Sequence, residues 1–367
     1  MIKAPTPDTS QNVQAELIMK LCDAFGPSNF EQDVAAVIKE ELKGFTLKKD
    51  SMGNLFLLPD TAHSSQPAMF VLDAHMDEVG LIVSGIQENG LLRIQPLGGF
   101  NAATMVGQTF LIRTESGDLV RGIIGSIPVH YRKEQDMDPD ALSLDIGCSS
   151  KEEVTKRGVS LGDPVTPDVS ASYDPKTGLI CAKALDDRIG VAAEIRVLEA
   201  LQNEGFPEGA VEAVFTVQEE VGERGMLSAV KHLSARFGIC FEGAPADDTF
   251  QPSDLAQTAL NKGVMVRVKD GSMLADRALI CQAKALAAEH HIPMQIAVRK
   301  AGGTNAAVLQ KADIPTIVLG IPVRYAHSPA GFCTMHDFQS AIDLALALIR
   351  ANLETENRPS NGSDFQD

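Results

Sequence analysis

Histidines and acidic residues recur in this sequence beside apolar segments. In chain order these groups are His75-Met76-Asp77, Asp186-Asp187, Glu219-Glu220, Glu242 and His327. Imidazole nitrogens and carboxylate oxygens are good ligands for Zn²⁺ and similar divalent ions. The same residue types also serve as general acids and bases. The sequence therefore contains the side chains of a metal centre, provided that the fold brings them together.

Glu219 and Glu220 are the most informative pair. They follow an apolar run at residues 214–217, and two adjacent acids at a strand end contribute little to stability. Neighbouring side chains on a strand point to opposite faces. One glutamate can therefore bind a metal while the other reaches toward a bound water.

The other groups fit the same chemistry, although each also has a simpler explanation. Asp77 can hydrogen-bond His75 from two residues away, which is the usual support of a metal-binding histidine; a satisfied surface histidine is the alternative. Asp186 and Asp187 precede a predicted helix and can cap its first turn. A carboxylate at that place can equally bridge two cations, because it has two oxygens.

Hydrophobic periodicity predicts an α/β domain built from two segments, residues 1–80 and 176–352. The predicted helices span residues 14–22, 189–203, 225–233, 273–290 and 338–352, and Ser28 or Asn29 is expected to cap a further helix. The predicted strands span residues 69–75, 211–217, 237–241, 295–298 and 316–319, and Gly53-Asn54 is predicted to form a hairpin turn.

The pattern changes between residues 81 and 175. Short apolar segments at residues 91–94, 109–112 and 122–125 alternate with turns, and glycines recur between them. This pattern is typical of a small β-barrel or β-sandwich. We therefore expect a β-rich domain inserted into the α/β domain, and a polar tail at residues 353–367.

The polar groups lie near the ends of successive predicted α/β strands. Open α/β sheets bind ligands at the carboxyl edge of their strands, so these groups are expected to meet there. A carboxylate shared between two ions is the signature of a two-metal hydrolase. The sequence thus favours a hydrolase with two metal ions.

The same segments resemble the M42 family of cobalt- or zinc-dependent aminopeptidases. The resemblance covers nearly the whole chain and is carried by HMD at 75–77, ALDDRIG at 184–190, VQEEVGERG at 217–225, FEG at 241–243 and RYAHSP at 324–329. It implies a zinc-exopeptidase-like fold, with a central mixed sheet flanked by helices and an inserted small β-barrel. It also implies two Zn²⁺ or Co²⁺ ions and an aminopeptidase that hydrolyses the N-terminal residues of peptide substrates.

The resemblance also implies a role for each site residue. The ligands of the two metals would be His75, Asp186 and Glu242 for the first, and Asp186, Glu220 and His327 for the second. Glu219 would be the general base. Asp77 would orient His75, and Asp187 would be a neighbour of the bridging carboxylate.

One position departs from the commoner family pattern, in which Asp stands where this chain has Glu242. The additional methylene shifts the reach of the carboxylate by about 1.5 Å. Some dipeptidases and carboxypeptidases of related clans use Glu there, so a metallohydrolase of that kind is an alternative. Two further segments are expected near the site: a loop at residues 302–305, and His130, which is expected to reach the site of a neighbouring subunit.

Two other classes of function compete with a metallopeptidase. A glycoside hydrolase is one, because some relatives carry an endoglucanase label and two carboxylates can act as acid and base. The absence of Trp and the two matched histidines favour metal chemistry instead. A non-catalytic scaffold is the other, and the complete ligand set argues against it.

Composition limits the partners. The chain has 367 residues and a formal net charge of −17, which repels nucleic acids and anionic membranes, so we expect neither as a partner. No apolar run reaches the roughly 18 residues of a membrane span. The N-terminus has no secretory pattern, and we expect a cytoplasmic protein. The β-rich insert resembles the family's dimerisation domain, which implies a homo-oligomer built from dimers, up to a dodecamer.

Overall fold

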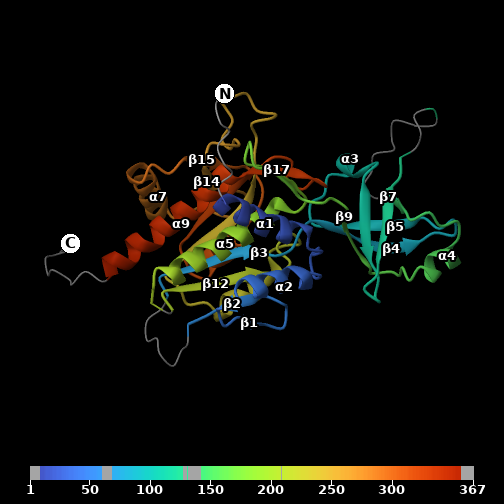
Figure 1. The fold of residues 1–367 in the computed structure, drawn as a ribbon, viewed down its shortest axis with the longest axis horizontal. Helices are drawn as coiled ribbons and strands as arrows, with labels where there is room; N and C mark the ends of the chain where they lie inside the picture. Colours follow the sequence, from blue (N-terminus) through green and yellow to red (C-terminus); the bar gives the residue numbers. More distant parts are fainter. Residues whose placement is uncertain (1–8, 60–67, 127–129, 131–141, 208, 357–367) are drawn as a thin grey trace.

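In the computed structural model, a helix-flanked sheet carries a β-barrel that projects to one side (Figure 1). The structure describes residues 9–59, 68–126, 130, 142–207 and 209–356. Within these residues no helix is long and apolar enough to span a membrane. The expected fold class, an α/β protein with a mixed sheet and an inserted barrel, is confirmed.

Eight strands form the sheet, in the order β1-β2-β12-β3-β13-β16-β14-β15. In that order they span Lys48–Lys49, Leu55–Leu57, Val211–Thr216, Phe70–His75, Phe237–Pro245, Thr316–Val323, Val264–Lys269 and Met294–Val298. The four central strands, β12, β3, β13 and β16, run parallel to their neighbours within this group. Their carboxyl ends therefore share one edge of the sheet, and the candidate site lies at this edge.

The outer strands make the sheet mixed. β2 runs antiparallel to β12, and β14 runs antiparallel to β16. β1 and β2 pair antiparallel around the predicted Gly53-Asn54 turn. The parallel, ligand-binding part of the sheet thus lies in its centre, where its strands have no free edge.

Helices cover both faces of the sheet. The larger core holds α1 (Thr9–Asp23), α2 (Gln32–Glu41), α5 (Leu185–Asn203), α7 (Arg277–Glu289) and α9 (Met335–Glu356), and the smaller core holds α6 (Arg224–Ala229) and α8 (Ala306–Lys311). On β12, Phe215 packs in the larger core and its neighbour Val214 in the smaller one. Strands that are buried on both faces need continuous apolar runs, and such runs made these strands recognisable in the sequence.

Six strands close into the barrel, in the order β4-β5-β8-β7-β6-β9. In chain order, β4 to β9 span Gly80–Ile86, Leu92–Leu97, Thr109–Arg113, Leu119–Ile124, Ser143–Asp145 and Pro164–Pro167. The short helices α3 (Ala102–Met105) and α4 (Lys151–Lys156) accompany them. The barrel has its own core, which includes Val83, Phe110 and Ile112. A separate core explains why the sequence pattern changes in this part of the chain.

A small third sheet and one strand of the large sheet were not predicted. The third sheet contains β10 (Ser172–Asp174), β11 (Leu179–Ala182) and β17 (Gly331–Thr334). The strand missed in the large sheet is β14, whose apolar run is interrupted by Arg267 and Lys269. The helix expected from residue 273 begins at Arg277, because the side chain of Asp276 caps its first turn.

Two expectations for chain segments differ from the structure. Neither Ser28 nor Asn29 caps α2: its N-cap residue is Glu31, which makes no side-chain capping bond. Ser28 instead donates a hydrogen bond to Asp77, 49 residues away. Of the expected polar tail, residues 353–356 belong to α9, and the remainder lies outside the described residues.

Truncation of Phe215 tests the core beneath the site. Phe215 is fully buried, so Phe215→Ala should lower the free energy of unfolding by about 3–5 kcal/mol through lost apolar burial and a residual cavity. Urea denaturation followed by circular dichroism measures this loss. Phe250 is 71% exposed, and Phe250→Ala is the matched control, with an expected change below about 0.5 kcal/mol. Equal losses in the two variants would contradict the burial of Phe215.

Candidate metal centre

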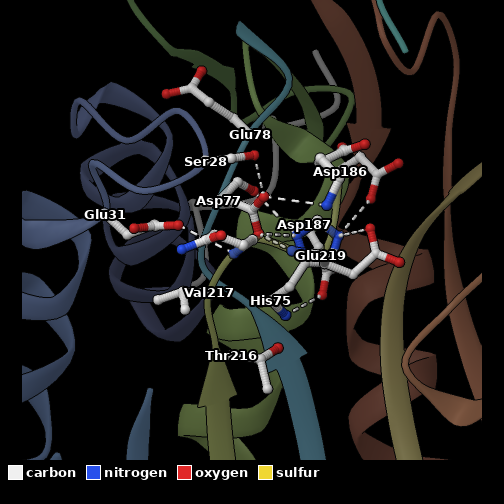
Figure 2. A network of polar contacts seen from close by, with 12 residues as sticks. Ser28, Glu31, His75, Asp77, Glu78, Asp186, Asp187, Thr216, Val217 and Glu219 are labelled. Atoms are coloured by element: carbon white, nitrogen blue, oxygen red, sulfur yellow. Dashed lines mark hydrogen bonds and ion pairs between the residues drawn. The ribbon is translucent and has the colours of Figure 1, made fainter. Parts of the chain in front are cut away.

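The polar groups singled out in the sequence meet at the carboxyl edge of the central strands. His75 is the last residue of β3, and Glu242 lies in the second half of β13. Asp186 is the second residue of α5, and Glu219 follows β12. Figure 2 shows His75, Asp77, Asp186, Asp187 and Glu219 converging on one small region. The parallel strands thus bring together residues that are far apart in the chain.

The first group of potential ligands consists of His75, Asp186 and Glu242. One donor atom of each lies within 4.8 Å of the others. The Nε2 atom of His75 is 3.4 Å from Oδ1 of Asp186. His75 and Glu242 are buried, so an ion held here would be largely shielded from solvent.

The second group consists of Asp186, Glu220 and His327, again with donor atoms within 4.8 Å of one another. The Nε2 atom of His327 is 3.3 Å from Oδ2 of Asp186 and 3.3 Å from Oε1 of Glu220. Asp186 therefore belongs to both groups, and each of its oxygens faces a different histidine. One carboxylate with this placement can be shared by two cations.

Asp77 holds the surroundings of His75 in place. The Nδ1 atom of His75 is 3.1 Å from the carbonyl oxygen of Asp77 and 3.4 Å from its carboxylate. That carboxylate also accepts hydrogen bonds from the backbone N–H groups of Glu219 and Glu220, at 2.9 and 3.2 Å. Burial would raise the pKa of Asp77, but its contacts with His75 and Ser28 lower it below the usual value.

Asp187 lies beneath the two groups and belongs to neither. It accepts hydrogen bonds from the backbone N–H groups of His75, at 3.3 Å, and Gly190, at 3.1 Å. A Cβ atom on Gly190 would lie only 2.1 Å from Oδ1 of Asp187. Gly243, beside Glu242, is equally constrained, because a Cβ atom there would lie 2.6 Å from Cα of Asp186. These contacts explain why glycine accompanies the acids in both motifs.

Glu219 and Glu220 lie differently from the strand-end arrangement expected from the sequence. β12 ends at Thr216, and the two glutamates belong to the turn that follows it. Strand alternation therefore does not separate their side chains; the turn does. Glu220 contacts His327, whereas Oε2 of Glu219 lies 3.9 Å from Nε2 of His75. Glu219 belongs to neither ligand group.

The electrostatics of the centre favour a bound cation. Burial raises the pKa of Glu219 well above its ordinary value and that of Glu242 to about 8. Burial lowers the pKa of His327, but contacts with Asp186 and Glu220 outweigh it and raise this pKa to about 11. Oδ1 of Asp186 and Oε1 of Glu220 are buried without a hydrogen-bond partner among the described residues. These donors fit a divalent ion.

Some neighbours of the site were given no role there from the sequence. The carbonyl oxygen of Gly99, in a loop of the barrel, lies 2.9 Å from Nδ1 of His327. Ser28 and Glu31, near the start of α2, bond to Asp77 and to the turn that carries Glu219. The Gly99 contact is made by a backbone carbonyl, which every residue type has, so the sequence does not indicate it. The contacts of Ser28 and Glu31 join parts of the chain that are far apart in sequence, so no local pattern predicts them.

Two further segments were expected near the site, the loop at residues 302–305 and His130. Asn305, in the expected loop at residues 302–305, is buried and donates to Oγ1 of Thr216 at 2.8 Å and to Asp73 at 3.3 Å. It thus supports the strand ends from below. His130 is exposed and belongs to neither ligand group, and its expected contact with another subunit stays a prediction.

Known proteins match this chain over most of its length. The model of the M42 glutamyl aminopeptidase family matches residues 53–344. The putative aminopeptidase FrvX of Escherichia coli is 30% identical over 93% of this chain and 95% of its own length.

Solved structures agree with this match. The TET aminopeptidase of a marine Thaumarchaeota archaeon is 31% identical, with a TM-score of 0.86 over 94% of this chain and 99% of that one. The TET1 peptidase of Pyrococcus horikoshii, described as assembling into a tetrahedron or an octahedral shell, is 29% identical, with a TM-score of 0.81 over 92% of this chain and 99% of that one.

The raised histidine pKa values predict how metal binding depends on pH. In the metal-free protein both imidazoles hold protons to unusually high pH, and a metal must displace those protons. The apparent affinity for Zn²⁺ should therefore rise as the pH increases from 6 to 8. Calorimetric titration in two buffers of different ionisation enthalpy measures both the affinity and the released protons. Asp186→Ala is the control that should abolish binding; an affinity independent of pH would contradict the prediction.

Proposed function

The chain belongs to the M42 family of glutamyl aminopeptidases and is a peptidase, and we propose that it removes N-terminal residues from peptides by a two-metal mechanism. The placement of Asp186 carries the two-metal part of this proposal. Its two carboxylate oxygens face His75 and His327 at 3.4 and 3.3 Å. A single carboxylate that is shared in this way is the arrangement that two-metal hydrolases use.

His75, Asp186 and Glu242 would hold one ion, and Asp186, Glu220 and His327 the other. The mixture of nitrogen and oxygen donors suits Zn²⁺ or Co²⁺. Such ions, when bound, supply a polarised scissile carbonyl and a water of lowered pKa. Glu242 retains the carboxylate of the commoner Asp, and its position within β13 directs the longer side chain into the first ligand group.

Glu219 has the properties of the general base. Its carboxylate lies beside His75 but outside both ligand groups. Burial raises its pKa, which suits a group that must take a proton and later release it near neutral pH. Glu219 would take a proton from the attacking water and deliver it to the nitrogen of the leaving amine. Asp77 supports this step through the backbone N–H of Glu219.

The β-barrel would be the dimerisation domain of this enzyme, inserted at residues 81–175 between the catalytic segments 1–80 and 176–352. Its strand β7 exposes Leu119 and Ile123, which are 53% and 49% accessible, on the outer surface. The assembly described for the TET1 peptidase of Pyrococcus horikoshii supports a homo-oligomer. The full assembly would then contain several catalytic sites in fixed relation to one another.

Chelation tests the class of reaction. EDTA should abolish hydrolysis of aminoacyl-p-nitroanilides, and added Zn²⁺ or Co²⁺ should restore it, because the ligands alone do not activate water. A scan over Glu, Lys and Leu derivatives gives the preferred N-terminal residue. N-acetylated peptides serve as the control and should resist cleavage. Their cleavage would favour the carboxypeptidase-like alternative, and EDTA-resistant cleavage of a β-glucan would favour a glycoside hydrolase.

Substitution of Glu219 tests the proposed base. Glu219→Gln should retain both metals in elemental analysis and lose activity by about 100-fold or more, because the amide cannot accept the proton. Glu289→Gln, at the exposed end of α7, is the control and should remain fully active. Normal turnover by Glu219→Gln with full metal content would remove Glu219 from the mechanism.

A further inference from the structure

The segment between α1 and α2 is bonded to the site at several points. We use the term brace for residues 26–31 of this segment. The backbone N–H of Gly26 donates to Glu78, and the Gly26 carbonyl accepts from the Glu78 backbone, at 3.2 and 3.0 Å. Ser28 donates to the Asp77 carboxylate at 2.6 Å. The brace is thus attached to the chain directly after His75.

Glu31 attaches the brace to the turn after β12. Its side chain is 4% exposed, and its Oε1 atom accepts from the backbone N–H groups of Asn29, at 2.8 Å, and Gln218, at 3.1 Å. The side-chain amide of Gln218 also donates to Oδ1 of Asn29 at 3.2 Å. Figure 2 shows Glu31 beside this turn and Ser28 beside Asp77. No metal-ligand role falls to Glu31, because it belongs to neither ligand group.

Gln218 has an unfavourable backbone conformation. Its φ is 54°, in the left-handed region, which costs free energy for any residue with a Cβ atom. Such a conformation persists only when the surrounding structure holds it. Gln218 directly precedes Glu219 and Glu220, so its φ angle sets the direction of the turn that carries both side chains.

Asp77 holds the same turn one and two residues later. Its carboxylate accepts from the backbone N–H groups of Glu219 and Glu220. Three successive N–H groups, those of residues 218 to 220, are therefore bound by two buried carboxylates. Glu31 holds the first of these groups and Asp77 the other two, while Ser28 of the brace holds Asp77.

We propose that Glu31 is a positioning residue, which fixes Gln218 and thereby aims Glu219 and Glu220 into the metal centre. This inference rests on the roles proposed above for Glu219 and Glu220. What Glu31 supplies is an acceptor oxygen in a fixed place. A glutamine amide oxygen can accept the same two hydrogen bonds, whereas alanine cannot.

Glu212 provides a matched comparison on the same strand. It lies near the other end of β12 and is 2% exposed, and its carboxylate accepts from the backbone N–H and the hydroxyl of Ser234. Glu212 and Glu31 are thus both buried glutamates that hold a backbone N–H group. Only Glu31 bonds to the turn that carries the proposed base.

The test compares Glu31→Ala, Glu31→Gln and Glu212→Ala at saturating Zn²⁺ or Co²⁺. Glu31→Ala should lower kcat by about 10-fold or more, because a misplaced base loses much of its contribution. KM should change little. Glu31→Gln should restore kcat to within about three-fold of the unmodified enzyme. Glu212→Ala should lower the melting temperature but leave kcat unchanged.

Hydrogen–deuterium exchange gives a readout that is independent of activity. In Glu31→Ala the amides of residues 218–220 should exchange faster, while those of β3 and β13 keep their protection. If Glu31→Ala does not fold, Glu31→Asp withdraws the carboxylate by one methylene and should show the same faster exchange with an intermediate kcat.

The possible contradictions are distinct. Unchanged kcat in Glu31→Ala, or equal losses in Glu31→Ala and Glu31→Gln, would overturn the positioning role, as would unchanged exchange of residues 218–220. Absence of metal-dependent peptidase activity in the unmodified enzyme would overturn the proposed function instead. The exchange experiment still tests the brace in that case.

Discussion

The candidate metal centre depends on one constraint: buried carboxylates repel one another unless positive charge lies between them. Asp186, Asp187, Glu219, Glu220 and Glu242 converge around two imidazoles, and burial raises the pKa of four of them. Asp186 is the exception, because its contacts with both histidines outweigh burial and lower its pKa. A central position between two cationic groups distinguishes this carboxylate from its neighbours. In the proposed mechanism, the same position would let it bridge two divalent ions.

The parallel centre of the sheet makes this concentration of charge possible. β3, β12 and β13 run parallel toward one edge, so polar residues in or just after their carboxyl-terminal parts meet without long loops. Buried carboxylates below the ligands then hold backbone N–H groups rather than metal: Asp77 binds those of Glu219 and Glu220, and Asp187 binds that of His75. These charge-assisted hydrogen bonds hold the segments that carry the potential metal ligands in place in the absence of substrate.

Most strands of the large sheet, and the acidic residues near their ends, could be predicted from the sequence, because continuous apolar runs and adjacent polar residues are local signals. Sequence reasoning did not find β14, whose run is broken by Arg267 and Lys269. It ascribed the separation of the Glu219 and Glu220 side chains to strand alternation, whereas both residues lie in the turn after β12. The contact of Glu31 with Gln218 joins residues 187 positions apart, and no local pattern records such a contact.

The contact between the barrel and His327 determines which ring nitrogen of His327 keeps its hydrogen. A carbonyl oxygen can only accept a hydrogen bond, so the carbonyl of Gly99 requires the hydrogen of His327 to be on Nδ1. The carbonyl of Asp77 imposes the same requirement on His75. In each ring Nε2 faces Asp186, and loss of the Nε2 proton to a metal would leave both rings as the Nδ1–H tautomer with the lone pair of Nε2 free to bind the ion. The barrel thus selects the tautomer of one imidazole, and the loop after β3 selects that of the other.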